Sequence, residues 1–316
     1  MPHIKNSINT DYKEHIDNSG WTLSTALTLG RVSNLPTIWT NVIAACLLSG
    51  GQLSITTLST LLLAMSAAYI GGMFLNDAYD HQYDSIYRPE RPIPSGKIPA
   101  SHVFNAGYGL LGLSVLLTYL VAIDWKGPGS CVMLCAFIII YNRWHKGNVL
   151  SPLLMGICRC LVYTSCALAV SSTISLTILI TAGASLAYLI GLTYTAKTGD
   201  RQCAKELWPM IAMIGPLMIF LFAENVDWLS VAAGVLFLMW LLQNLISSWR
   251  KQSKVSVGKL IAGICLLDGL LICLFAHHHM GTVNSVLTNE LLVSVWLLCT
   301  LFCASTVWLQ RKISGT

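Results

Sequence analysis

Acidic residues recur at helical spacing in the stretch from 76 to 97. Asp77, Asp80 and Asp84 lie at offsets of three and seven residues, which places them on one face of a helix. Asn76 joins this face, because it precedes Asp80 by four residues. Carboxylates this close repel one another unless a cation lies between them, and Mg²⁺ takes oxygen ligands of this kind. We therefore predict that Asn76, Asp77, Asp80 and Asp84 bind Mg²⁺ and that the three aspartates are catalytic.

Basic residues follow the acids within the same stretch. Arg88 and Arg91 can pair with phosphate oxygens, and three prolines between 89 and 94 stiffen the chain around them. Acids for a metal followed by bases for phosphate indicate a pyrophosphate site. The alternative is a solvated loop with ordinary surface charge. The cluster directly follows an apolar run, however, and ionisable groups at the edge of a membrane span are costly and often functional.

The composition indicates an integral membrane protein. Of the 316 residues, 54% are hydrophobic and 10% are charged, whereas a soluble domain has about 25% charged residues. Apolar runs of about 20 residues recur along the chain, which favours helices over a β-barrel. We expect an all-α polytopic membrane protein with nine to ten transmembrane helices. The expected spans lie near residues 32–49, 55–76, 102–123, 128–142, 150–170, 173–194, 207–223, 228–248, 257–276 and 286–309.

Nearly all basic residues of the loops fall on one side of the membrane if these spans are correct. The positive-inside rule then places both termini and the acid-rich stretch in the cytoplasm. Residues 1–20 are polar and lack the apolar core of a secretory signal, so we expect an N-terminal segment at the interface. Most of the eleven cysteines lie in apolar runs and none forms C-x-x-C, which favours packing over a disulfide framework or zinc site.

The acid-rich stretch resembles a motif of the UbiA family of intramembrane prenyltransferases. That family's first aspartate motif is N-D-x-x-D-x-x-x-D followed by R-P-I-P-S-G, and both halves occur here at 76–84 and 91–96. The resemblance implies one domain over residues 1–316, with helices arranged as a ring around a central cavity. The family usually has nine spans, so 286–309 would be an additional helix.

Further site residues follow from this resemblance. Asn34 lies in an R-x-x-N-x-P entry to the first span, although Ser or Asn before Pro also suits an ordinary helix start. Tyr141 and Lys146 resemble the family's Tyr-then-Lys element, for which plain interfacial anchoring is the alternative. Arg159 lies about two turns into the fifth span in a G-x-x-R pattern, and could otherwise snorkel to the interface. All of these are candidate substrate-binding residues.

The loop after the sixth span departs from the family. A second acidic motif is usual there, but this chain has only Asp200 and Glu206, six residues apart. Lys197, Asp200 and Arg201 are the candidate substrate-binding residues of this loop, because a base could neutralise phosphate in place of a second metal.

The resemblance and the charge pattern together predict a Mg²⁺-dependent prenyltransferase. We expect ionisation of a prenyl diphosphate and transfer of the prenyl group to a hydrophobic or amphipathic acceptor among membrane lipids, in the inner membrane and without a nucleic-acid partner. The alternative is a non-catalytic protein that binds or transports an isoprenoid or lipid intermediate and retains the pyrophosphate pocket.

Overall fold

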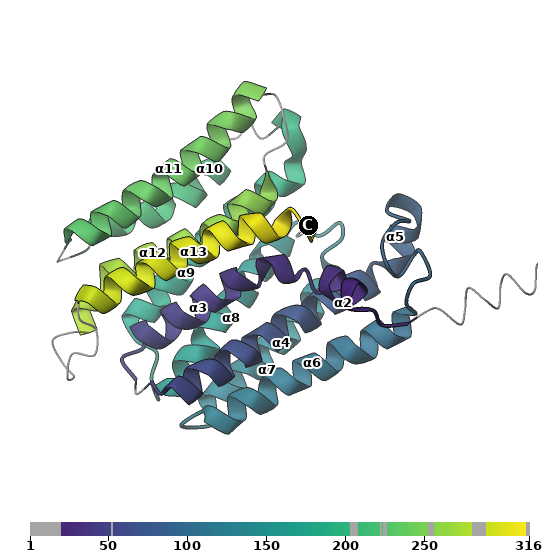
Figure 1. The fold of residues 1–316 in the computed structure, drawn as a ribbon, viewed down its shortest axis with the longest axis horizontal. Coiled ribbons are helices and arrows are strands. Elements are labelled where there is room, and N and C mark those ends of the chain that lie inside the picture. Colours follow the sequence, from purple (N-terminus) through teal and green to yellow (C-terminus); the bar gives the residue numbers. More distant parts are fainter. Residues whose placement is uncertain are drawn as a thin grey trace, which may run out of the picture.

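The protein consists of helices that run side by side (Figure 1). The computed structural model describes the backbone of residues 20–51, 53–202, 208–221, 223, 226–251, 256–279 and 289–313. The side chains of 197–202, 247–251 and 276–279 lie outside the described residues, as does the N-terminal segment 1–19.

The N-terminal half supplies the helices that carry the acid-rich stretch. Short α2 precedes a single 3₁₀ turn, η1, which leads directly into α3. Ser54 caps the following long helix, α4, by accepting a hydrogen bond from the Thr57 backbone N–H at 3.0 Å. The bounds are α2 Leu23–Leu29, η1 Val32–Asn34, α3 Leu35–Leu48, α4 Ile55–Tyr79, α5 His81–Tyr87, α6 Ala100–Val121 and α7 Lys126–Trp144.

The C-terminal half begins with a helix that has Pro152 in its first turn, where the missing N–H costs no hydrogen bond. A second proline, Pro216, lies where α10 gives way to the 3₁₀ helix η2. The bounds are α8 Ser151–Val170, α9 Leu176–Gln202, α10 Trp208–Ile214, η2 Gly215–Leu221, α11 Trp228–Lys251, α12 Val257–His279 and α13 Asn289–Gln310.

Seven of the described helices are long and apolar enough to cross a membrane: α4, α6, α8, α9, α11, α12 and α13. The other three expected spans coincide with α3, with α7 and with the pair α10 and η2, which are shorter or less apolar. The expectation of an all-α, multi-pass membrane protein is confirmed.

Helix α12 lies at the centre and α13 at the periphery. In an 18-residue apolar window of α12, within Val257–Phe275, 78% of the residues are buried, compared with 22% in the equivalent window of α13. Helix α13, yellow in Figure 1, packs along α12 and also contacts α3 and η1. The apolar residues of α13 that face outward suit a lipid environment.

Close contact between α4 and α6 depends on small residues. A Cβ added to Gly71 of α4 would lie 2.8 Å from the carbonyl oxygen of Gly107 in α6. Such contacts let two membrane helices approach backbone to backbone. The tight packing fixes the direction of α4, whose last turn bears the acidic residues.

The acid-rich stretch remains helical beyond the end of α4. Asp80 separates α4 from α5, but its N–H donates to the Asn76 carbonyl at 3.0 Å and its carbonyl accepts from the Asp84 N–H at 2.8 Å. These i to i+4 bonds keep Asn76, Asp80 and Asp84 on one side of the helical path, as their spacing predicts.

Candidate active site

A cavity of about 780 Å³ lies between six helices, α3, α4, α7, α8, α9 and α12, which each contribute lining residues. Most of its charged lining comes from the turn before α3, from the end of α4, from α5 with the loop after it, and from the end of α7. The rest of the wall is mainly apolar. We call this charged part the acid-rich rim; its cavity-lining charged and amide residues are Arg31, Asn34, Asn76, Asp80, Asp84, Arg88, Arg91, Asn142, His145 and Lys146.

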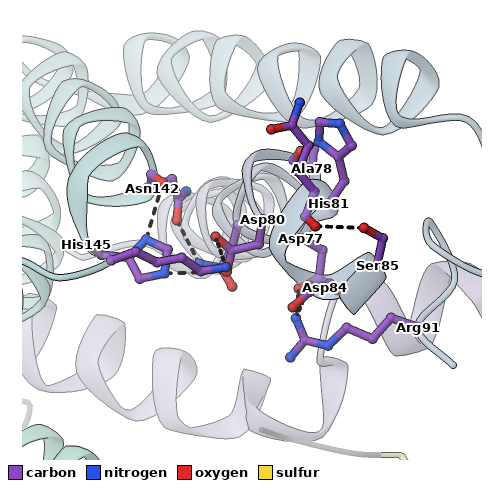
Figure 2. A network of polar contacts seen from close by, with 12 residues as sticks. Asp77, Ala78, Asp80, His81, Asp84, Ser85, Arg91, Asn142 and His145 are labelled. Carbon is purple, nitrogen blue, oxygen red and sulfur yellow. Dashed lines mark hydrogen bonds and ion pairs between the residues drawn. The ribbon is translucent and has the colours of Figure 1, made fainter. Parts of the chain in front are cut away.

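Two arginines neutralise the first and third aspartates. Arg91 donates to the Asp84 carboxylate at 2.6 Å and approaches Asp77 at 3.3 Å, as the Asp84 pair in Figure 2 illustrates. Arg31, from the turn before α3, donates to Asp77 at 3.0 Å. Asp77 does not line the cavity; it is buried just behind the wall and fixes both guanidinium groups.

Asp80 pairs with bases from the end of α7. Lys146 Nζ lies 2.9 Å from one of its carboxylate oxygens, and His145 Nε2 lies 3.4 Å from the other. Figure 2 shows His145 beside Asp80. The same Lys146 ammonium lies 3.6 Å from the centre of the Tyr83 ring, a cation–π contact. Burial alone would raise the pKa of the Asp80 carboxyl, but the hydrogen bonds and positive charges of His145 and Lys146 outweigh it and lower the pKa.

Asn76 is oriented by Asn142 of α7. The Asn76 amide donates to the Asn142 side-chain oxygen at 3.2 Å, and the Asn142 amide donates to the Gly72 carbonyl at 2.9 Å. The Asn76 oxygen therefore faces away from Asn142, and it accepts a hydrogen bond from Arg31 at 3.3 Å. This orientation leaves an oxygen, rather than an N–H group, beside the carboxylates.

Arg31 adopts a backbone conformation that non-glycine residues rarely take. Its φ is 42°, in the left-handed region, and it is the only described non-glycine residue with positive φ. The Tyr69 hydroxyl, from α4, donates to its carbonyl at 3.3 Å. Such strain costs about 1–3 kcal/mol and persists where the surroundings hold the residue in place, which points to a functional role for Arg31.

The structure brings most of the predicted site residues together. The cavity is lined by Asn34, Asn76, Asp80, Asp84, Arg88, Arg91, Tyr141, Lys146 and Arg159, with Asp77 behind the wall. The side chains of Lys197, Asp200 and Arg201 lie outside the described residues. Sequence reasoning missed Arg31, Tyr83, Asn142 and His145, although Arg31 begins the R-x-x-N-x-P pattern and the last two flank predicted residues.

The predicted metal ligands have the right chemistry for Mg²⁺. Asn76, Asp80 and Asp84 present hard oxygen donors to the cavity. Among the described residues, however, no three His, Cys, Asp or Glu side chains converge as a metal cluster. The carboxylates are instead paired with Arg91, His145 and Lys146. The donor set fits the ion, but these ion pairs would have to loosen for it to bind.

Helix α13 contacts the site through one side chain. The Gln310 amide donates to the Asn34 side-chain oxygen at 2.9 Å and to the Gly258 carbonyl at 3.0 Å. Asn34 lines the cavity, and Tyr69 lies within hydrogen-bonding reach of it. The additional helix expected at the C-terminus thus has a direct connection to a predicted site residue.

Fold and site together define a multi-pass helical membrane protein with a largely apolar cavity and a charged rim suited to an anionic group. The sequence profile of the UbiA prenyltransferase family matches residues 35–267. The chain belongs to that family.

Curated relatives match over parts of their length. A digeranylgeranylglyceryl phosphate synthase of Methanosphaera stadtmanae is 27% identical over 137 residues, which is 43% of this chain and 46% of the relative. The enzyme of that name from Methanosarcina mazei is 44% identical over 79 residues, 25% of this chain and 27% of the relative. The chain therefore spans less than half the length of these relatives in each alignment.

Solved structures show the same fold. An apo UbiA homologue from Aeropyrum pernix K1 has a TM-score of 0.64 at 14% identity, over 76% of this chain and 96% of that one. A chain from a study of digeranylgeranylglyceryl phosphate synthase in membranes has a TM-score of 0.57 at 18% identity, over 82% of this chain and 98% of that one. A UbiA homologue from Archaeoglobus fulgidus bound to GPP and Mg²⁺ has a TM-score of 0.50 at 14% identity, over 90% of this chain and 98% of that one.

Proposed function

We propose that this protein transfers a prenyl group from a prenyl diphosphate to an acceptor within the membrane. The observation that carries the proposal is the cavity itself, which joins a rim of paired acids and bases to a mainly apolar interior. A diphosphate suits the rim and an isoprenoid chain suits the interior. Family membership and the GPP-bound homologue support the same reaction class.

The bases of the rim would hold the diphosphate. Arg88 lines the cavity and forms no ion pair with a described residue, so its guanidinium is available to phosphate oxygens. Arg91 and Lys146 are held at the rim by Asp84 and Asp80. Their positive charge stabilises the pyrophosphate as the allylic C–O bond breaks and pyrophosphate leaves with the electron pair.

Mg²⁺ would be held by Asn76, Asp80 and Asp84, with Asp77 behind them fixing Arg31 and Arg91. When bound, the ion would neutralise phosphate charge and favour departure of pyrophosphate.

The apolar wall would protect the allylic carbocation. Met65, Leu134 and Ile264, among others, line the cavity away from the rim. Exclusion of water prevents hydrolysis of a reactive cation, so that the acceptor nucleophile captures it and then releases a proton. The relatives named above suggest a glyceryl phosphate lipid as the acceptor. The bias of basic loops supports a rim that faces the cytoplasm.

Binding of geranylgeranyl thiolodiphosphate, which resists hydrolysis, to the purified full-length chain tests the donor site. We expect binding that requires Mg²⁺ and disappears with EDTA. Asp80→Asn should weaken it by about 30-fold or more, because it removes a charged ligand that would hold the Mg²⁺ on which binding depends.

The matched control is Asp124→Asn, which makes the same change in the loop after α6, outside the cavity lining. Asp124→Asn should bind as the wild type does. Binding that is indifferent to Asp80 would overturn the assignment of the site. Tight, Asp80-dependent binding with no release of pyrophosphate from geranylgeranyl diphosphate, whether a phosphate or a carboxylate acceptor is supplied, would favour the carrier function.

A further inference from the structure

Arg159 is a charged residue inside a membrane helix, and its hydrogen-bond partners, Thr37 and Asn41 of α3, are not acids or bases of the acid-rich rim. It lies eight residues after Ser151, the first residue of α8, which is about 12 Å along the helix axis. It lines the same cavity as Asp80, whose wall on α8 and α9 also includes the apolar Val162 and Leu189. A cation at this depth is costly unless it has a partner.

The protein satisfies only part of the Arg159 guanidinium. Its Nη1 donates to the Thr37 carbonyl at 3.2 Å and to the Asn41 side-chain oxygen. A guanidinium has five N–H donors, and Nε and Nη2 donate to none of the described residues. Both protein partners are neutral oxygens. The cavity thus contains an arginine with unused donors and no carboxylate in contact with it among the described side chains.

A buried network holds Arg159 in place from behind. Asp268 of α12 is fully buried and accepts hydrogen bonds from Thr40 at 2.5 Å, from the Asn41 amide at 2.6 Å and from Tyr163. Because the Asn41 amide nitrogen faces Asp268, the Asn41 oxygen must face the opposite way, toward Arg159. Asp268 therefore fixes Asn41, and Asn41 fixes the guanidinium.

We propose that Arg159, positioned by Asp268 through Asn41, binds an anionic head group of the acceptor, a phosphate monoester or a carboxylate. A planar guanidinium with adjacent free N–H groups pairs with either anion in a bidentate manner. Arg159 forms no ion pair with the acids of the rim and is held instead by Thr37 and Asn41, so this anion would bind apart from the diphosphate of the donor. A neutral acceptor would leave the Arg159 donors unpaired, so the site selects against it.

This inference rests on the proposed prenyl transfer and is tested with donor and acceptor binding measured separately. The purified full-length chain is titrated with geranylgeranyl thiolodiphosphate and Mg²⁺, and separately with geranylgeranylglyceryl phosphate, its dephosphorylated alcohol and 4-hydroxybenzoate. We expect the wild type to prefer one of the two anions over the neutral alcohol by about tenfold or more.

Three variants locate this preference. Arg159→Gln should abolish it while leaving donor binding unchanged, and Arg159→Lys should retain part of it. Asp268→Asn should raise the acceptor KM more than it lowers kcat, which a purely structural defect would not do. Arg143→Gln is the matched control, because Arg143 is an exposed arginine on α7 outside the cavity lining.

The other possible results contradict either this inference or the proposed function. Equal loss of donor and acceptor binding in Arg159→Gln would overturn the inference by assigning Arg159 to the diphosphate. So would an anion preference that survives Arg159→Gln, or a wild type with no anion preference. Absence of donor binding in the wild type would instead overturn the proposed function.

Discussion

The acid-rich rim and the network around Asp268 handle buried charge in different ways. At the rim, Asp80 and Asp84 each contact a base, as does Asp77 just behind it. In the interior, Asp268 is held by hydroxyl and amide donors, and Arg159 reaches it only through Asn41. Direct ion pairs can exchange partners when a charged ligand arrives. A network of hydrogen bonds from neutral hydroxyl and amide groups is instead fixed in geometry, but only while every member is present. We therefore expect the ion pairs of the rim to rearrange when a ligand binds and the hydrogen bonds around Asp268 to remain unchanged.

The largest contrast should appear when one acid is removed from each region. Asp268→Ala leaves three buried hydrogen-bond donors, those of Thr40, Asn41 and Tyr163, without their acceptor. It should lower the free energy of unfolding by about 3 kcal/mol. Asp84→Ala should cost less, about 1–2 kcal/mol, because Arg91 lines the cavity and keeps Asp77 as a second partner. Thermal unfolding in detergent measures both.

Prenyl transfer should show the opposite order. Asp84→Ala should reduce kcat by about 100-fold, since in our proposal Asp84 would hold Mg²⁺ and keeps Arg91 in place for the diphosphate. If Asp84→Ala proves the more destabilising of the two substitutions, the distinction between an exchangeable rim and a fixed interior is wrong.

The pH response of the rim sharpens the comparison. The pKa of Asp80 is lowered by His145 and Lys146 despite burial, so the charged form persists to a lower pH than for an ordinary aspartate. The stability from its ion pairs is present above the ordinary aspartate pKa and is lost as pH falls through the lowered one. His145→Gln removes one of these causes and should move the loss of Mg²⁺-dependent donor binding to higher pH.

A pH titration of thiolodiphosphate binding measures this shift. His102→Gln serves as a control, because His102 is an exposed histidine in the first turn of α6 outside the cavity lining. An unchanged midpoint in His145→Gln would show that Lys146 alone sets the charge of Asp80.

The smallest effect is expected where α13 meets the site. Gln310→Ala removes hydrogen bonds to Asn34 and to the Gly258 carbonyl, and should cost about 1 kcal/mol of stability. Because Asn34 lines the cavity, substrate KM should rise by a few-fold with little change in kcat. Lys312→Ala, two residues farther along and exposed, is the control. A wild-type KM in Gln310→Ala would mean that α13 only covers α3 and α12.

The membrane class, the helical fold and the acid-rich rim are all predictable from the amino-acid sequence. Local patterns suffice for these features, because a span is a run of apolar residues and Asn76, Asp80 and Asp84 share a face through helical spacing alone. The family resemblance also led to Asn34, Tyr141, Lys146 and Arg159, all of which line the cavity.

The partners of these charges, in contrast, depend on how the helices pack. Asp268 is separated from Asn41 by 227 positions, and Gln310 from Asn34 by 276, so no local spacing could link them. From the sequence, Arg31 is only a basic residue before the first span, but in the structure it contacts Asp77 from a left-handed backbone conformation. Hydrophobic burial fixes which helices meet but not which polar side chains face one another; that follows from helix rotation and register, which only the packed structure sets.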